Sequence, residues 1–178
     1  MRIRRLRRRD VPAISSLYYE TVRRINARDY APDRIAAWAP RVYPDAFWLQ
    51  RLRRCRVFVA EDEGRVVGFA ELAPDGGIDW FYVHHAHQGK GVGMALMTRV
   101  EGEARRRGDA RLVADVSITA EPFFHRMGFR VVRRQIKIYH NRPFKQAVME
   151  KRMGSFSFAK PSYRGWEWRP SGEGRAPR

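Results

Sequence analysis

Residues 78–97 read IDWFYVHHAHQGKGVGMALM, and this stretch decides the fold. Its first part is mostly aromatic or β-branched, which predicts a buried strand over 78–83. Three glycines within 88–93 then open an amphipathic pattern that predicts a helix over 91–107. Glycines at a helix start allow backbone N–H groups to converge where the helix dipole favours negative charge. The stretch therefore indicates either a phosphate-binding turn or an ordinary glycine-rich helix cap.

Two common phosphate-binding motifs do not fit this stretch. Met94 and Ala95 follow the last glycine, where a nucleotide P-loop has Lys and then Ser or Thr. A dinucleotide-binding fold has its glycine turn after the first strand and an acidic residue ~20 positions later. Here the turn comes in the middle of the chain, after several expected strands. Both classes are therefore excluded.

The remaining elements follow from apolar periodicity and turn residues. We expect further strands at 2–6, 56–61, 65–72, 111–116, 129–139 and 145–153, the last two joined by a turn at 141–143. We expect helices that start at Val11, capped by Asp10, and at Pro32, and others over 45–54 and 121–127. These elements predict one α/β domain over 1–153, followed by a disordered or loosely docked tail over 154–178, where Gly, Ser, Pro and Arg dominate.

Composition limits the class of protein. Of the 178 residues, 36 are Lys or Arg and 19 are Asp or Glu, which gives a formal charge of +17. That excess indicates either a solvated basic surface or attraction to an anion such as nucleic acid or a phosphate-rich cofactor. The single cysteine, Cys55, excludes an internal disulfide, and we expect it to be a buried structural thiol. Since no long apolar run exists, we expect no membrane contact and a cytoplasmic location.

Two motifs together resemble the GNAT superfamily of N-acetyltransferases. Gln88-x-x-Gly91-x-Gly93, after the strand ending at Val83, is similar to that family's acetyl-CoA-binding motif. Residues 116–129, VSITAEPFFHRMGF, resemble its second signature. Residues 30–39, YAPDRIAAWA, resemble the bacterial YafP-like group within it. The resemblance implies a central mixed, mostly antiparallel sheet of about six to seven strands flanked by helices, and acetyl-CoA as acyl donor.

The resemblance also implies roles for particular positions. The backbone of one strand would pair with the pantetheine arm, the amides of the following turn would hold the pyrophosphate, and two residues would line the far side of the thioester. These sets are Phe81, Tyr82 and Val83; Gln88, Gly89, Lys90, Gly91, Val92 and Gly93; and Ser117 and Phe124.

The chain departs from the family pattern at two of these positions. Ser117 stands where Asn is common, and Phe124 stands where the family commonly has Tyr. That tyrosine is proposed to protonate the departing thiolate, and Phe124 has no proton to give. His125 follows it on a short helix, so we expect its side chain to point away from the thioester.

Acetyl transfer to an amine needs a base that removes a proton from the ammonium group. Asp79 lies within an apolar strand and shares a face with Phe81 and Val83, so we expect burial to raise its pKa. An Asp that caps the strand or pairs with an Arg has the same pattern. Glu71, in the preceding strand, is the second candidate.

Three histidines and three tryptophans are further candidates for a role in the site. The histidines at 84, 85 and 87 lie in a loop without a regular ligand pattern, and we expect no metal there. We expect Trp38, Trp48 and Trp80 to form core or pocket wall.

The sequence therefore predicts an N-acetyltransferase acting on a primary amine of a small molecule or peptide. The alternatives are a CoA-binding regulator whose catalysis has lapsed, suggested by Ser117 and Phe124, and a basic nucleic-acid-binding protein. No recognised nucleic-acid-binding motif supports the latter, so we expect no nucleic-acid partner. A homodimer is compatible with the sequence, which leaves the oligomeric state open.

Overall fold

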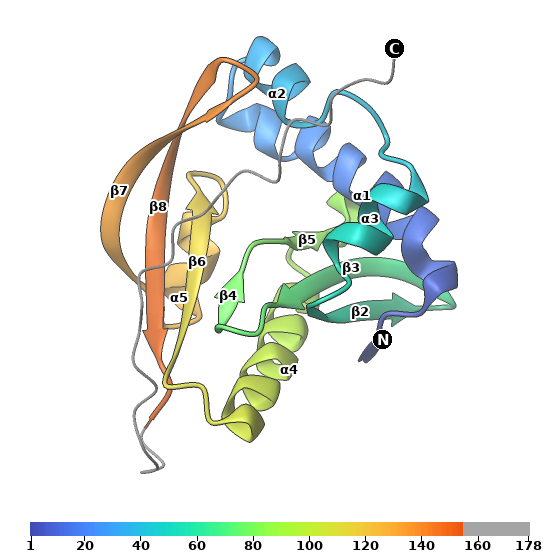
Figure 1. The fold of residues 1–178 in the computed structure, drawn as a ribbon. Coiled ribbons are helices and arrows are strands. Elements are labelled where there is room, and N and C mark those ends of the chain that lie inside the picture. The colour runs from blue at the N-terminus through green and yellow to red at the C-terminus, as the bar shows by residue number, and fades with distance from the viewer. Residues whose placement is uncertain (155–178) are drawn as a thin grey trace.

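The computed structural model describes residues 1–154, and it places eight strands in two sheets (Figure 1). The first sheet has the order β1–β2–β3–β5 and the second has the order β4–β6–β8–β7. The strands are β1 (Arg2–Arg5), β2 (Arg56–Asp62), β3 (Arg65–Leu72), β4 (Gly77–Ile78), β5 (Phe81–Val83), β6 (Arg111–Ser117), β7 (Arg130–Tyr139) and β8 (Arg142–Arg152). The tail expected over 154–178 lies outside the described residues, except for Gly154.

Helices cover both faces of the first sheet. In Figure 1, α1 and α3 lie above β2 and β3, and α4 lies below them. α2 lies near the β7–β8 hairpin, and α5 packs beside β6. The helices are α1 (Val11–Arg24), α2 (Pro32–Trp38), α3 (Asp45–Arg51), α4 (Val92–Arg107) and α5 (Glu121–Arg126), with single 3-10 turns η1 (Arg8–Asp10), η2 (Asn26–Arg28) and η3 (His85–His87).

The first sheet separates two hydrophobic cores. Along β2, Val57 and Val59 join the core shared with α1, α2 and α3, whereas Phe58 and Ala60 join the core shared with α4 and α5. Alternate side chains of a strand point to opposite faces, so a continuous apolar run is needed to bury both. The run VFVA after Arg56 meets this requirement.

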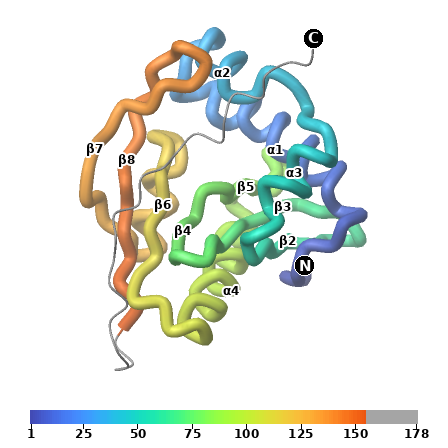
Figure 2. Tube along the Cα trace, viewed as in Figure 1, coloured from blue at the N-terminus to red at the C-terminus, as the bar shows by residue number. Residues whose placement is uncertain are grey.

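The single strand expected over 78–83 is wrong, and the break positions the site. Gly77 and Ile78 pair with β6 in parallel, while Phe81–Val83 pairs with β3 in antiparallel. Asp79 and Trp80 lie between the two pairings, so the chain leaves one sheet and joins the other there. The two sheets diverge at this point, as the trace in Figure 2 shows.

Three smaller expectations also change. Asp10 does not cap α1, because its carboxylate accepts hydrogen bonds from the Arg4 guanidinium (2.6 and 2.9 Å) and the Arg7 N–H (2.7 Å). Helix α3 ends at Arg51, since the chain turns there to enter β2. The last hairpin turns at 140–141, where both residues have positive φ, as a tight two-residue turn requires.

Helix α4 forms as expected between two glycines. Gly91 and Gly108 cap its ends with φ of 78° and 76°, a left-handed conformation that favours glycine. The expected α/β class, with a mixed and mostly antiparallel arrangement flanked by helices, is confirmed, with eight strands where six to seven were expected.

None of the helices formed by residues 1–154 has the length and apolar character needed to cross a membrane.

Candidate active site

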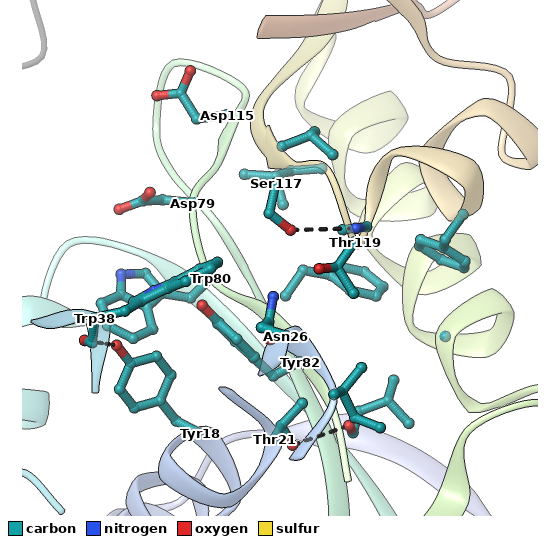
Figure 3. Close-up of a pocket in the computed structure, with 18 of the residues that line it drawn as sticks. Tyr18, Thr21, Asn26, Trp38, Asp79, Trp80, Tyr82, Asp115, Ser117 and Thr119 are labelled. Atoms are coloured by element: carbon teal, nitrogen blue, oxygen red, sulfur yellow. Dashed lines mark hydrogen bonds between the residues drawn. The ribbon is translucent and has the colours of Figure 1, made fainter. Parts of the chain in front are cut away.

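A cavity opens where β5 diverges from β6. It encloses about 2100 Å³ and is lined by β5 and the turn after it, by the ends of β6 and α5, and by residues of α1, α2 and α3. In Figure 3, Asp79 and Trp80 lie on one side of the pocket, and Ser117 and Thr119 lie on the other. Pockets for a single ligand usually measure ~300–1,000 Å³, so this cavity has room for two ligands.

Among residues 1–154 no strand pairs with one edge of β5, and this edge faces the cavity. The Glu71 N–H of β3 donates to the Trp80 carbonyl over 2.9 Å, which fixes the side on which β3 pairs. Backbone groups alternate in direction along an antiparallel strand, so Phe81 and Val83 direct theirs away from β3. The unpaired edge can therefore hydrogen-bond an extended ligand as an additional strand would.

Two side chains hold the turn after β5 in place, and the space beside its first two glycines is empty. The Gln88 Nε2 donates to the Val83 carbonyl over 2.7 Å, and the Thr21 hydroxyl donates to the same carbonyl over 3.2 Å. Gly89 and Gly91 have φ of 73° and 78°. A Cβ built at either glycine would meet nothing within 4 Å, so the glycines provide the left-handed conformation beside open space.

The start of α4 presents unpaired N–H groups to that space. The Ala95 N–H donates to the Gly91 carbonyl over 3.0 Å as the helix begins, which leaves the N–H groups of Val92, Gly93 and Met94 without an intrahelical acceptor. These three residues line the cavity. Orphan N–H groups and the positive end of the helix dipole fit a phosphate group. Gly93 has a packing role as well, because a Cβ there would lie 3.0 Å from the Phe123 ring.

Ser117 and Phe124 form the opposite wall. The Ser117 hydroxyl accepts the Ala120 N–H over 3.2 Å and so fixes the start of α5. Phe124 is buried, with its ring centroid 5.8 Å from that of Phe81. His125 points away, as expected: it is half exposed and its Nε2 lies 3.4 Å from Glu121.

Asp79 opens into the cavity but is not desolvated as expected. Its side chain is 33% exposed and forms an ion pair with Arg51 of α3. The Arg51 guanidinium also lies 3.5 Å from a carboxylate oxygen of Glu71. One cation is thus shared by both candidate bases. Of these two acids, Asp79 lines the cavity and Glu71 does not.

Of the two candidate bases, Glu71 is the one that is shielded from solvent. Its side chain is 1% exposed, and burial raises its pKa to about 8 despite the nearby Arg51. Burial also raises the pKa of the Cys55 thiol to about 11, with Glu71 adding to the effect. Cys55 is half-buried rather than fully buried, and its thiol stays protonated at neutral pH.

Aromatic rings surround the Asp79 end of the cavity. The ring centroid of Tyr18 lies 4.7 Å from that of Trp80 and 5.1 Å from that of Tyr82. The Trp38 indole lines the cavity as well, whereas Trp48 is fully buried behind Trp80. The expectation of core or pocket wall for these tryptophans is confirmed.

The structure thus brings most of the expected site residues together. Those lining the cavity are Asp79, Phe81, Tyr82, Val83, Gln88, Gly89, Gly91, Val92, Gly93, Ser117 and Phe124. Lys90 is exposed and lies outside the lining, so its expected part in phosphate binding rests on charge alone.

Asp115 and Arg51 are polar lining residues that the sequence did not single out. Asp115 is buried in β6, bound to Lys137 and, over 2.8 Å, to the Gln135 amide. Its place within the alternating pattern RLVADVS gave the same signal that singled out Asp79. Arg51 gave no such signal, because its relation to Asp79 depends on how α3 packs.

Three side chains gather where α1 meets the turn, but their hydrogen bonds oppose metal ligation. Glu20 Oε2 lies 3.6 Å from His84 Nε2 and 3.5 Å from His85 Nδ1. The Ala86 N–H donates to His84 Nδ1 over 3.2 Å, and Arg24 donates to His85 Nε2 over 3.1 Å. In a neutral imidazole the other nitrogen then carries the proton. The nitrogens that face Glu20 are therefore N–H donors.

Comparison with known proteins adds independent information. The family model of the GNAT acetyltransferase domain matches residues 26–145. Among curated relatives, the uncharacterised N-acetyltransferase YafP of Escherichia coli is 29% identical over 76% of this chain and 85% of that protein. The L-methionine sulfoximine/L-methionine sulfone acetyltransferase of Salmonella typhimurium is 32% identical over 74% of this chain and 81% of that protein.

Solved structures share the arrangement. A GCN5-related N-acetyltransferase from Rhodopseudomonas palustris superposes with a TM-score of 0.81 at 27% identity, covering 85% of this chain and 95% of that one. The putative acetyltransferase yncA of Salmonella typhimurium, solved with its cofactor acetyl-CoA, gives a TM-score of 0.68 at 25% identity, covering 90% and 98%.

Proposed function

Since the chain belongs to the GNAT family of acetyltransferases, we propose that it transfers acetyl from acetyl-CoA directly to a primary amine of a small molecule or peptide. One observation carries the proposal: the unpaired edge of β5, the open glycine turn and Asp79 all border a single cavity. Donor and acceptor would meet there without moving a domain.

The donor half is proposed to rely on the backbone. The N–H and carbonyl of Phe81 and the N–H of Val83 would hydrogen-bond the pantetheine arm, since the Val83 carbonyl already accepts from Gln88 and Thr21. The N–H groups of Val92 and Gly93 would hold the pyrophosphate. A backbone N–H of β5 would also polarise the carbonyl under attack. The yncA structure, which contains acetyl-CoA, supports this placement by similarity of fold.

The acceptor half is proposed to rely on side chains. An amine is nucleophilic only when neutral, so Asp79 would accept the proton of the incoming ammonium group. Arg51 would hold the Asp79 carboxylate in place through their ion pair. Glu71 lies behind this pair and outside the cavity lining, which supports a positioning role for it rather than direct proton transfer.

Phe124 leaves the departing thiolate without the family's usual acid. Acetyl-CoA supplies a thioester, whose thiol leaving group has a pKa of about 8.5, so its anion is tolerable near neutrality. Phe124 and Phe81 would exclude water from this region through their packed rings. We therefore expect a slow but genuine enzyme.

The test is thiol release from acetyl-CoA in the presence of a panel of primary amines and amino acids, with the acetylated product identified by mass spectrometry. Amine-dependent release with N-acetylated product supports the proposal. CoA binding without any turnover would instead favour the lapsed regulator that Ser117 and Phe124 suggest.

A further inference from the structure

The wall beside Asp79 is built from stacked and edge-on aromatic rings. Tyr43 and Phe47 stack with centroids 4.3 Å apart and an interplanar angle of 20°. Both are half-buried and line the cavity, next to the Tyr18 and Trp80 rings described above. Phe47 meets Trp80 edge-on with centroids 6.5 Å apart. A flat ring of the acceptor can pack against such a wall, and an ammonium group can approach the faces of the rings.

The charges at this end disfavour a carboxylate beside the amine of the acceptor. Arg51 already serves the carboxylate of Asp79 and lies near that of Glu71, with its guanidinium 5.9 Å from the Trp80 ring centroid. A carboxylate on the acceptor would compete for Arg51 and would lie beside the negative charge of Asp79. Asp115, across the cavity, adds another acid that is already bound to Lys137.

Cations also occur at the cavity mouth, where they have less influence. Arg41, Arg53 and Arg126 line the cavity but are exposed. Water and salt screen exposed charges, so a pair formed there contributes only ~0–1 kcal/mol.

On the basis of the proposed acetyl transfer, we propose that the preferred acceptor is an arylalkylamine: a primary amine joined by a short chain to an aromatic ring, with no carboxylate beside the amine. The ring would pack against Tyr43 and Phe47, and the ammonium group would approach Asp79. This acceptor differs from those of the relative named for L-methionine sulfoximine and L-methionine sulfone, which carry a carboxylate beside the amine.

Matched substrate pairs test this directly with the wild-type full chain. The pairs are 2-phenylethylamine with L-phenylalanine and tryptamine with L-tryptophan, which differ only in the carboxylate; butylamine serves as the amine without a ring. We expect kcat/KM to be at least ~10-fold higher for each arylalkylamine than for its amino acid, because placing like charges together costs several kcal/mol. We expect ~5-fold higher kcat/KM for 2-phenylethylamine than for butylamine, from the ring contact.

A pair of variants on α3 separates the aromatic wall from general damage. Phe47→Ala should lower kcat/KM for 2-phenylethylamine ~5-fold more than it lowers kcat/KM for butylamine, because only the first amine has a ring to pack on this wall. Leu49→Ala removes an apolar side chain from the same helix outside the cavity lining and should affect both amines equally.

The outcomes are distinguishable. Equal or better turnover of the amino acids, or equal loss with both amines in Phe47→Ala, overturns the acceptor class while acetyl transfer stands. Absence of turnover with every amine, in a protein that binds CoA by calorimetry, overturns the proposed function and the acceptor class with it.

Discussion

The two ends of the cavity are built from different parts of the polypeptide. At the donor end, the edge of β5, the turn at 88–93 and the start of α4 present backbone N–H groups from one continuous stretch. At the acceptor end, Asp79, Arg51 and the aromatic rings come from segments far apart in the chain. Under the proposed function, cofactor binding would therefore depend on backbone conformation, whereas catalysis and acceptor choice would depend on individual side chains.

The largest expected effect is at the acceptor end. Asp79→Asn keeps the size of the side chain but removes the base, so kcat should fall ~10²–10⁴-fold, the usual contribution of a positioned acid or base. Steady-state kinetics on the folded variant provide the measurement. Glu71→Gln is the matched control, and we expect it to retain most of kcat. An active Asp79→Asn enzyme beside an inactive Glu71→Gln enzyme would transfer the role to Glu71.

At the donor end, Gly91→Glu should weaken CoA binding by ~10²-fold or more, because a negative side chain would enter the phosphate site. Gly108→Glu is a close control. It places the same residue at the other end of α4, at a glycine with nearly the same φ and equally open surroundings. The backbone strain is therefore matched. Calorimetry that shows equal losses in both variants would mean that helix strain, and not the phosphate site, is responsible.

The buried Glu71 should make the free energy of unfolding depend on pH. Unfolded Glu71 ionises near pH 4.5, whereas the folded protein holds its proton until its pKa of about 8. The folded state therefore binds more protons between these values, and stability falls as pH rises through this window. Glu71→Gln should lose this contribution, so its Tm relative to wild type should rise by several degrees from pH 5 to pH 9. Parallel Tm curves for the two proteins would contradict the buried position.

The smallest expected effect is at Phe124, which stands where the family commonly has a tyrosine acid. Phe124→Tyr restores a hydroxyl to the wall, and kcat should stay equal or rise a few-fold if thiolate departure limits the rate. His125→Ala should matter little, since that side chain points away and pairs with Glu121. A loss of rate at high pH that His125→Ala removes would instead identify His125 as the acid.

The sequence predicts the glycine turn and helix α4 because their signal is local. The strand residues, the glycines and the amphipathic helix lie within 78–107, and turn geometry follows from neighbouring residues. The acceptor end is harder to predict from the sequence. The break at Asp79 and Trp80 depends on Gly77 and Ile78 pairing with β6, a contact that no local pattern encodes.

The same limit explains why Glu71, and not Asp79, is the acid that is buried. Period-2 alternation placed Asp79 at the site, but the ion pair with Arg51 depends on the packing of α3. Glu71, the second candidate in the preceding strand, is the acid that is buried. Which of two acids is desolvated is decided by long-range packing, and one sequence does not reveal it.

The most direct test of this division is a calorimetric titration of CoA into Asp79→Asn. If the donor end depends on the backbone and the acceptor end on side chains, the variant should bind CoA with wild-type affinity, within about two-fold, while its kcat is reduced ~10²–10⁴-fold. A variant that loses CoA affinity together with activity would contradict the account, because Asp79 would then be part of the donor site.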